Sequence, residues 1–117
     1  MARPDISVVD LERLSLVRVI GGTVHGDITS SETELDCTGL AGSVGYPMVV
    51  ELHASTACYL RQGATGVALD ADNDNNCEMA AGEKLEVVVS GAENAFFSYE
   101  RVSADGVLKA TRKDAVA

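Results

Sequence analysis

Apolar and polar residues alternate along most of the chain in short runs, which is the period of a β-strand with one buried face. In residues 47–54 the apolar side chains of Met48, Val50 and Leu52 fall on one side of the expected strand. Gly, Asn, Asp or Ser residues bound each run. The expected strands are 16–20, 23–28, 33–37, 47–54, 57–63, 84–91, 95–102 and 107–113. Short strands at this spacing predict an all-β fold, a mostly antiparallel β-sandwich or barrel.

The connections between the last strands carry turn residues. Asp105-Gly106 is a strong hairpin signal because both residues tolerate positive φ. Residues 91–94 separate the two strands before it. We therefore expect the last three strands to form a meander. The glycine-rich stretch 38–45 is expected to be a loop, since it lacks the lysine of a phosphate-binding loop.

The N-terminal stretch is the one place with a helical pattern. Val8, Leu11 and Leu14 would share a face of a helix of about two turns. The β-branched residues in the same stretch suit an extended arm equally well, and such an arm would fit the sheet edge of a neighbouring molecule. The expected organisation is an N-terminal arm or short helix over residues 1–14 and a single β-sandwich domain over residues 15–117.

The composition predicts a single domain built of closely packed sheets. The chain has 117 residues, which fits one domain with a core of its own. Only 4% of the residues are aromatic and Trp is absent, whereas Val, Ala and Gly are abundant. Side chains of this kind suit closely packed sheets better than a roomy ligand pocket.

The charge excludes some partners. Eighteen acidic and nine basic residues give a net charge of −9, and an acidic surface repels phosphate backbones and anionic lipids. We expect no direct binding to nucleic acid and no membrane association. Asp5 stands where a secretory signal would need an apolar run, so no signal peptide is expected.

The three cysteines, Cys37, Cys58 and Cys77, contain no close ligand pair. Without an export signal we expect reduced thiols, at least two of them buried. Structural zinc sites usually show a close pair of ligands, so inert thiols are favoured over a zinc site that would add His25 and His53.

The aspartates of ALDADNDNNCEM, residues 68–79, match the start of a calcium-binding loop of the EF-hand type. Asp70, Asp72 and Asp74 occupy its first, third and fifth positions. Asn75 replaces the glycine of the sixth position and Ala81 replaces the bidentate glutamate of the twelfth. We expect an exposed loop without a bound metal. The alternative, a weak calcium or magnesium site at the three aspartates, remains open.

No motif predicts catalysis. His25 and His53 lack a triad-like context, and no G-x-S-x-G is present. Glu32, Glu34 and Asp36 alternate, so they share a strand face where paired carboxylates could hydrolyse glycosides. A solvated sheet face explains them more simply. We expect no catalytic residue and no cofactor, and the chain is not expected to be an enzyme.

The C-terminal half resembles small virion proteins of tailed bacteriophages. The resemblance lies in CYLRQGATGVA, NCEMAAGEKLEVVVSG and AFFSYERVSADGVLKATR. The matching positions are Tyr59, Arg61 and Gly63, then Met79 and Gly82, then Gly106, Leu108, Thr111 and Arg112. The chain departs from this pattern in its long Asp/Asn stretch and its three cysteines.

The resemblance implies a β-sandwich with a structural role in the virion, most specifically a capsid decoration (cement) protein that binds the capsid lattice or itself. Its partners would be capsid or other virion proteins and further copies of the chain. It would be made in the host cytoplasm and located in the virion. Val49, Val88 and Phe96 are expected to be outward apolar positions that suit such contacts. The alternative function is a carbohydrate- or ligand-binding β-sandwich module, possibly calcium-stabilised.

Overall fold

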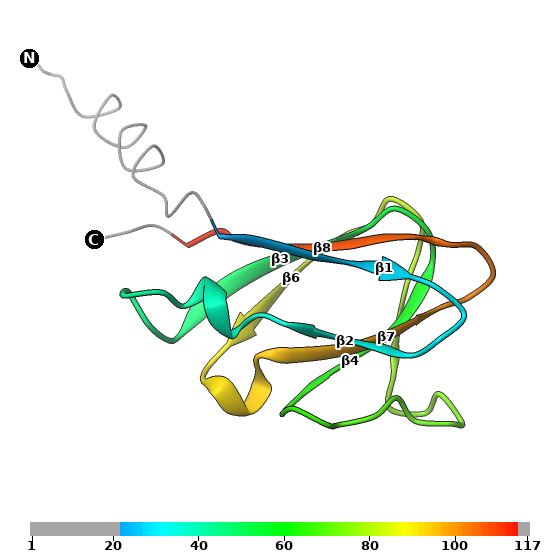
Figure 1. The fold of residues 1–117 in the computed structure, drawn as a ribbon, viewed down its shortest axis with the longest axis horizontal. Helices are drawn as coiled ribbons and strands as arrows, with labels where there is room; N and C mark the ends of the chain where they lie inside the picture. The colour runs from blue at the N-terminus through cyan, green and yellow to red at the C-terminus, as the bar shows by residue number, and fades with distance from the viewer. Residues whose placement is uncertain (1–21, 115–117) are drawn as a thin grey trace, which may run out of the picture.

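The computed structural model describes residues 22–114, which form two antiparallel sheets of four strands each, packed face to face (Figure 1). The first sheet has the order β1-β8-β3-β6 and the second has the order β2-β7-β4-β5. The strands are β1 (Thr23–Ile28), β2 (Thr33–Asp36), β3 (Met48–Ala54), β4 (Cys58–Gly63), β5 (Cys77–Met79), β6 (Lys84–Val89), β7 (Phe96–Arg101) and β8 (Gly106–Arg112). The expected β-sandwich is confirmed. The arm or helix over residues 1–14 and the strand over 16–20 lie outside the described residues.

Consecutive strands mostly alternate between the two sheets. Of the described strands, only β4 and β5 are neighbours both along the chain and within a sheet. This strand order is that of a jelly roll, a sandwich of two interlocked Greek keys. The predicted C-terminal meander is therefore wrong. β7 lies in the second sheet between β2 and β4, and β8 lies in the first between β1 and β3. The turn at Asp105-Gly106 leads from one sheet to the other, because turn chemistry reverses the chain without fixing which sheet receives the next strand.

Two further differences concern short elements. β5 was not expected because three residues are too few to show a strand period. The segments expected as loops contain single turns of 3-10 helix, η1 (Thr38–Leu40) and η2 (Ala92–Asn94). Residues 22–114 contain no helix of the length and hydropathy needed to cross a membrane.

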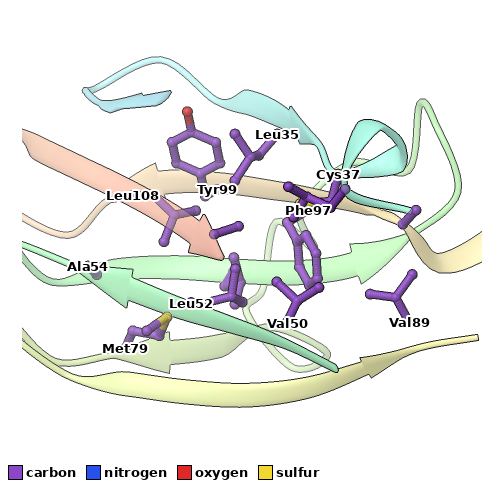
Figure 2. Packing of buried hydrophobic residues seen from close by; sticks show 14 of the residues in the cluster. Leu35, Cys37, Val50, Leu52, Ala54, Met79, Val89, Phe97, Tyr99 and Leu108 are labelled. Carbon is purple, nitrogen blue, oxygen red and sulfur yellow. The ribbon is translucent and has the colours of Figure 1, made fainter. Parts of the chain in front are cut away.

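The core lies between the sheets and is built by the strand alternation. In β3 every second residue from Met48 to Ala54 is fully buried. Figure 2 shows the ring of Phe97 of β7 directed toward Val50 of the first sheet, whereas the ring of Tyr99 of β7 extends away from Leu108. The Tyr99 hydroxyl group lies against Gly26 of β1. Each large apolar side chain removed from water in this way contributes about 2 kcal/mol to folding. The inward face predicted for residues 47–54 is confirmed.

The outward apolar positions are confirmed only in part. Val88 is 59% exposed on β6. Val49 beside it is half-buried. Phe96 is also half-buried and packs against the core. Two of the three candidates therefore offer little apolar surface in the described structure.

An ion pair closes one end of the sandwich. Arg112 of β8 is 2% exposed, and its Nε and Nη2 donate to the two carboxylate oxygens of Asp114 at 2.7 and 2.8 Å. Its Nη1 donates to the carbonyl oxygens of Leu40 and Ala41 at 3.2 and 3.0 Å. Because Leu40 and Ala41 follow β2, this guanidinium ties the first sheet to a connection that leaves the second.

Candidate functional site

The loop between β4 and β5, residues 64–76, folds back over the outer face of the second sheet. Figure 1 shows it in green on the side of that sheet that faces away from the first. Arg61 of β4 donates from Nη1 to the carbonyl oxygen of Ala68 at 3.1 Å. Ser98 of β7 donates from its hydroxyl to the carbonyl oxygen of Val67 and is 4% exposed. The loop therefore lies against β4 and β7, and its far side reaches β2.

Two carboxylates hold this loop, that of Glu34 in β2 and that of Glu32 directly before the strand. Glu34 accepts the backbone N–H of Gly66 at Oε2 (2.7 Å) and the hydroxyl of Thr65 at Oε1 (3.2 Å). The next outward carboxylate, Glu32, accepts the backbone N–H of Leu69 at 3.0 Å. Hydrogen bonds to a charged acceptor are stronger than neutral ones. Glu32 and Glu34 therefore anchor the β4–β5 loop, whereas the sequence predicted that they would lie on a solvated sheet face.

Asp36, the third of the alternating acidic residues and the last residue of β2, has a local role. Its Oδ1 accepts the backbone N–H of Thr38 at 2.9 Å and the hydroxyl of the same residue at 2.6 Å. This arrangement begins the η1 turn. The three alternating acidic residues are therefore engaged by the chain itself, and two of them by one loop.

The aspartate run forms the tip of the loop, and its hydrogen bonds are internal. Asp70 accepts the backbone N–H of Asp72 at 3.1 Å and the side-chain amide of Asn75 at 2.8 Å. Asn76 exchanges hydrogen bonds with the backbone of Asp70, accepting at 3.0 Å and donating at 2.9 Å. Donors around the ionised form, Asp72 N–H first among them, lower the pKa of Asp70. The tip is held together by amide groups.

The geometry of this tip differs from an EF-hand loop. The residue in the left-handed region is Asn73, with φ of 61°, whereas an EF-hand turns at its sixth position, which Asn75 occupies here. Asp72 and Asp74 are exposed, as expected. Within residues 22–114 no three His, Cys, Asp or Glu side chains gather in an arrangement that could hold a metal ion. That Asp70, Asp72 and Asp74 bind no metal in solution stays a prediction.

The thiols and histidines lie in different parts of the sandwich. Cys37 and Cys58 are buried and Cys77 is exposed, and all three are free. Burial confirms the expectation for two of them. Desolvation raises the pKa of Cys37 to about 12 and that of Cys58 to about 11, so both stay protonated and inert at neutral pH. Both histidines lie on the outward side of strands in the first sheet, and the described structure does not bring them to the thiols.

Two hollows border the anchored loop. One of about 260 Å³ is lined by Glu32, Thr33, Glu34 and Ser98 and by the loop residues Gly66, Val67 and Ala68. The other, of about 250 Å³, lies between Tyr59 and the aspartate tip. Its lining residues are Glu32, Tyr59, Leu69, Asp70, Ala71, Asn73 and Glu100. The second hollow combines one aromatic ring with carboxylate and amide groups.

Comparison with known proteins adds no relative. No protein-family model, no curated protein and no solved structure matches the chain.

Proposed function

We propose that the protein is a structural component of a virion, a capsid decoration protein that binds the capsid lattice or its own copies. The observation that carries the proposal is the use of two carboxylates as anchors of a loop. Glu32 and Glu34 accept hydrogen bonds from backbone groups of the β4–β5 loop, so they fix an outer surface. A loop that is anchored in this way gives the protein a defined outer surface, which suits a protein that functions by binding through its exterior.

Two further observations support the proposal. The jelly roll is an architecture of viral capsid domains, and the C-terminal strands carry the phage-like pattern at residues that the fold uses structurally. Arg112 of that pattern is the buried clamp, and Gly82 has the positive φ of a turn, at 80°. A jelly roll also serves other functions, so the support from architecture is general and the support from the pattern is more specific.

The test is the composition of purified particles. Mass spectrometry of virions made in the cell that produces this chain should detect it in a fixed ratio to the major capsid protein. Image reconstruction should place a jelly roll of this size on the outer capsid surface. Particles that lack the chain, or that carry it only in traces that washing removes, contradict the proposal.

The hollow beside Tyr59 supports a second candidate, a carbohydrate-binding module. Sugar sites combine a ring for stacking with carboxylates and amides for hydroxyl groups, and Tyr59, Asp70 and Asn73 supply these groups around about 250 Å³. Binding on a glycan array that Tyr59→Ala removes supports this candidate. Tyr46→Ala is the matched control, since Tyr46 packs against the core instead.

A further inference from the structure

The outer face of the first sheet carries two parallel rows of charged and polar residues. The strand register sets directly opposing residues side by side across all four strands. One row, the Lys/His row, consists of His25, Lys109, His53 and Lys84. The adjacent row, the acidic row, consists of Thr23, Thr111, Glu51 and Glu86. Both histidines of the chain and two of its three lysines therefore lie in one line.

Each row places like groups next to one another. Lys109 lies between His25 and His53, and Glu51 lies directly opposite Glu86. Like charges opposite one another on neighbouring strands are destabilising. Among the described residues, the one ion pair on this face joins Lys113 Nζ to Glu51 Oε1 at 4.0 Å. A partner that sets each row against the opposite charge would relieve this repulsion.

The face is neutral although the chain is strongly acidic. Its three lysines, Lys84, Lys109 and Lys113, balance three carboxylates. These carboxylates are Asp27, Glu51 and Glu86. The chain's net charge of −9 therefore arises elsewhere. Two copies of an acidic protein repel each other least where their surfaces carry no net charge.

We propose that this face binds the same face of a second copy of the chain, with a two-fold axis running between the two rows. Such a rotation keeps each position across the sheet and exchanges the rows. Lys84 then faces Glu86 of the second copy, and His53 faces its Glu51. The contact is isologous. Sheets packed face to face lie about 10 Å apart, a gap that opposing lysine and glutamate side chains span together.

The inference deepens the proposed function by naming one partner of the chain, and its test requires no virion. Sedimentation equilibrium of the full chain should show a dimer in low salt, with weaker association at about 0.5 M salt. Lys84→Glu and Glu86→Lys should each raise the dimer dissociation constant at least about tenfold, because each sets like charges against one another.

The double variant Lys84→Glu/Glu86→Lys exchanges the two charges and should return the dissociation constant to within about threefold of the original. Glu78→Lys is the control: it makes the same charge change at an exposed position of β5, in the second sheet, and should leave association unchanged. Thermal melts of every variant establish that it is folded.

Three results overturn the inference. They are a chain that is monomeric in low salt, a dimer that Glu86→Lys and Glu78→Lys weaken equally, and a double variant that associates no better than its single parents. A monomeric chain found in stoichiometric amount on virions overturns the inference and leaves the proposed function standing. A dimer that responds to the charge swap as predicted, in a chain that is absent from virions, supports the inference and contradicts the proposed function.

Discussion

The two outer faces of the sandwich have the same strand period and opposite surroundings. On the second sheet the β4–β5 loop lies over the strands, and the carboxylates of Glu32 and Glu34 hold its backbone. On the first sheet, Glu86 and Lys84 of β6 lie opposite Glu51 and His53 of β3, and both β6 residues are exposed. One face engages Glu32 and Glu34 with N–H donors of the chain itself, whereas on the other face the one ion pair among the described residues joins Glu51 to Lys113.

The difference shows that an outward position in a strand does not by itself determine what a carboxylate does. Its role depends on whether a connection is long enough to return over it. Residues 64–76 provide such a connection for the second sheet. The turn between β7 and β8 is short and ends directly at Gly106. A covered face is suited to a fixed exterior, and an exposed face with complementary rows is suited to assembly.

The largest effect is expected at the end of the sandwich, where Arg112 joins the two sheets. Arg112→Ala leaves a partly buried carboxylate at Asp114 and two carbonyl groups without their donor, which should lower the free energy of unfolding by about 3 kcal/mol. Arg101→Ala is the control because the Arg101–Asp105 pair, at 2.8 Å, is exposed, and it should cost less than about 0.5 kcal/mol. Urea denaturation measures both values, and equal losses would refute the clamp.

Acid should weaken the same end of the molecule. The hydrogen bond from Arg112 lowers the pKa of Asp114 below its ordinary value. A carboxyl group whose pKa is lower in the folded state contributes stability that is present above its unfolded pKa of about 4 and is lost as pH falls through the folded pKa. The melting temperature should therefore decrease as the pH is lowered below about 4. In Asp114→Asn this fall should be smaller, and a profile identical to that of the original chain would contradict the assignment.

A smaller effect should separate the two faces directly. Glu34→Ala removes the acceptor of Gly66 N–H and should lower the free energy of unfolding by about 1 kcal/mol. Glu86→Ala removes an exposed carboxylate that stands opposite Glu51, so it should change stability by less than about 0.5 kcal/mol, in the stabilising direction. If the two substitutions cost the same in denaturant titrations at low protein concentration, the faces do not differ as described.

The strands could be predicted from the sequence because alternation is a local signal. Met48, Val50 and Leu52 lie one strand period apart, and they are buried as that period requires. The sheet order could not be predicted, since Asp105-Gly106 reverses the chain equally well within a sheet or between sheets. The Lys/His row depends wholly on that order. Its four residues are distant along the chain, and only the strand order β1-β8-β3-β6 makes them neighbours.

The contacts of the β4–β5 loop could not be predicted from the sequence for a different reason. The partner of Glu34 is the backbone N–H of Gly66, and a backbone group leaves no mark in the residue pattern. The exposed tip was predictable because Asn and Asp favour turns through side-chain hydrogen bonds, and Asn76 makes bonds of this kind with Asp70.

The smallest effect is expected at the loop tip. Because amide groups already hold Asp70, a calcium chelator should leave the melting temperature unchanged, and Asp72→Ala should alter it by no more than about one degree. Differential scanning fluorimetry with and without calcium measures this. A fall of several degrees in chelator that Asp72→Ala abolishes would establish a metal site on the covered face.

The difference between the faces is tested most directly by an NMR dilution series of the full chain in low salt. Backbone amide shifts are followed from millimolar to micromolar concentration. The account predicts concentration-dependent shifts at His25, His53, Lys84, Glu86 and Lys109, with residues 64–76 unchanged. Shifts confined to the loop, or no shift at any residue, would contradict the claim that one face is closed by its own chain and the other binds a second copy.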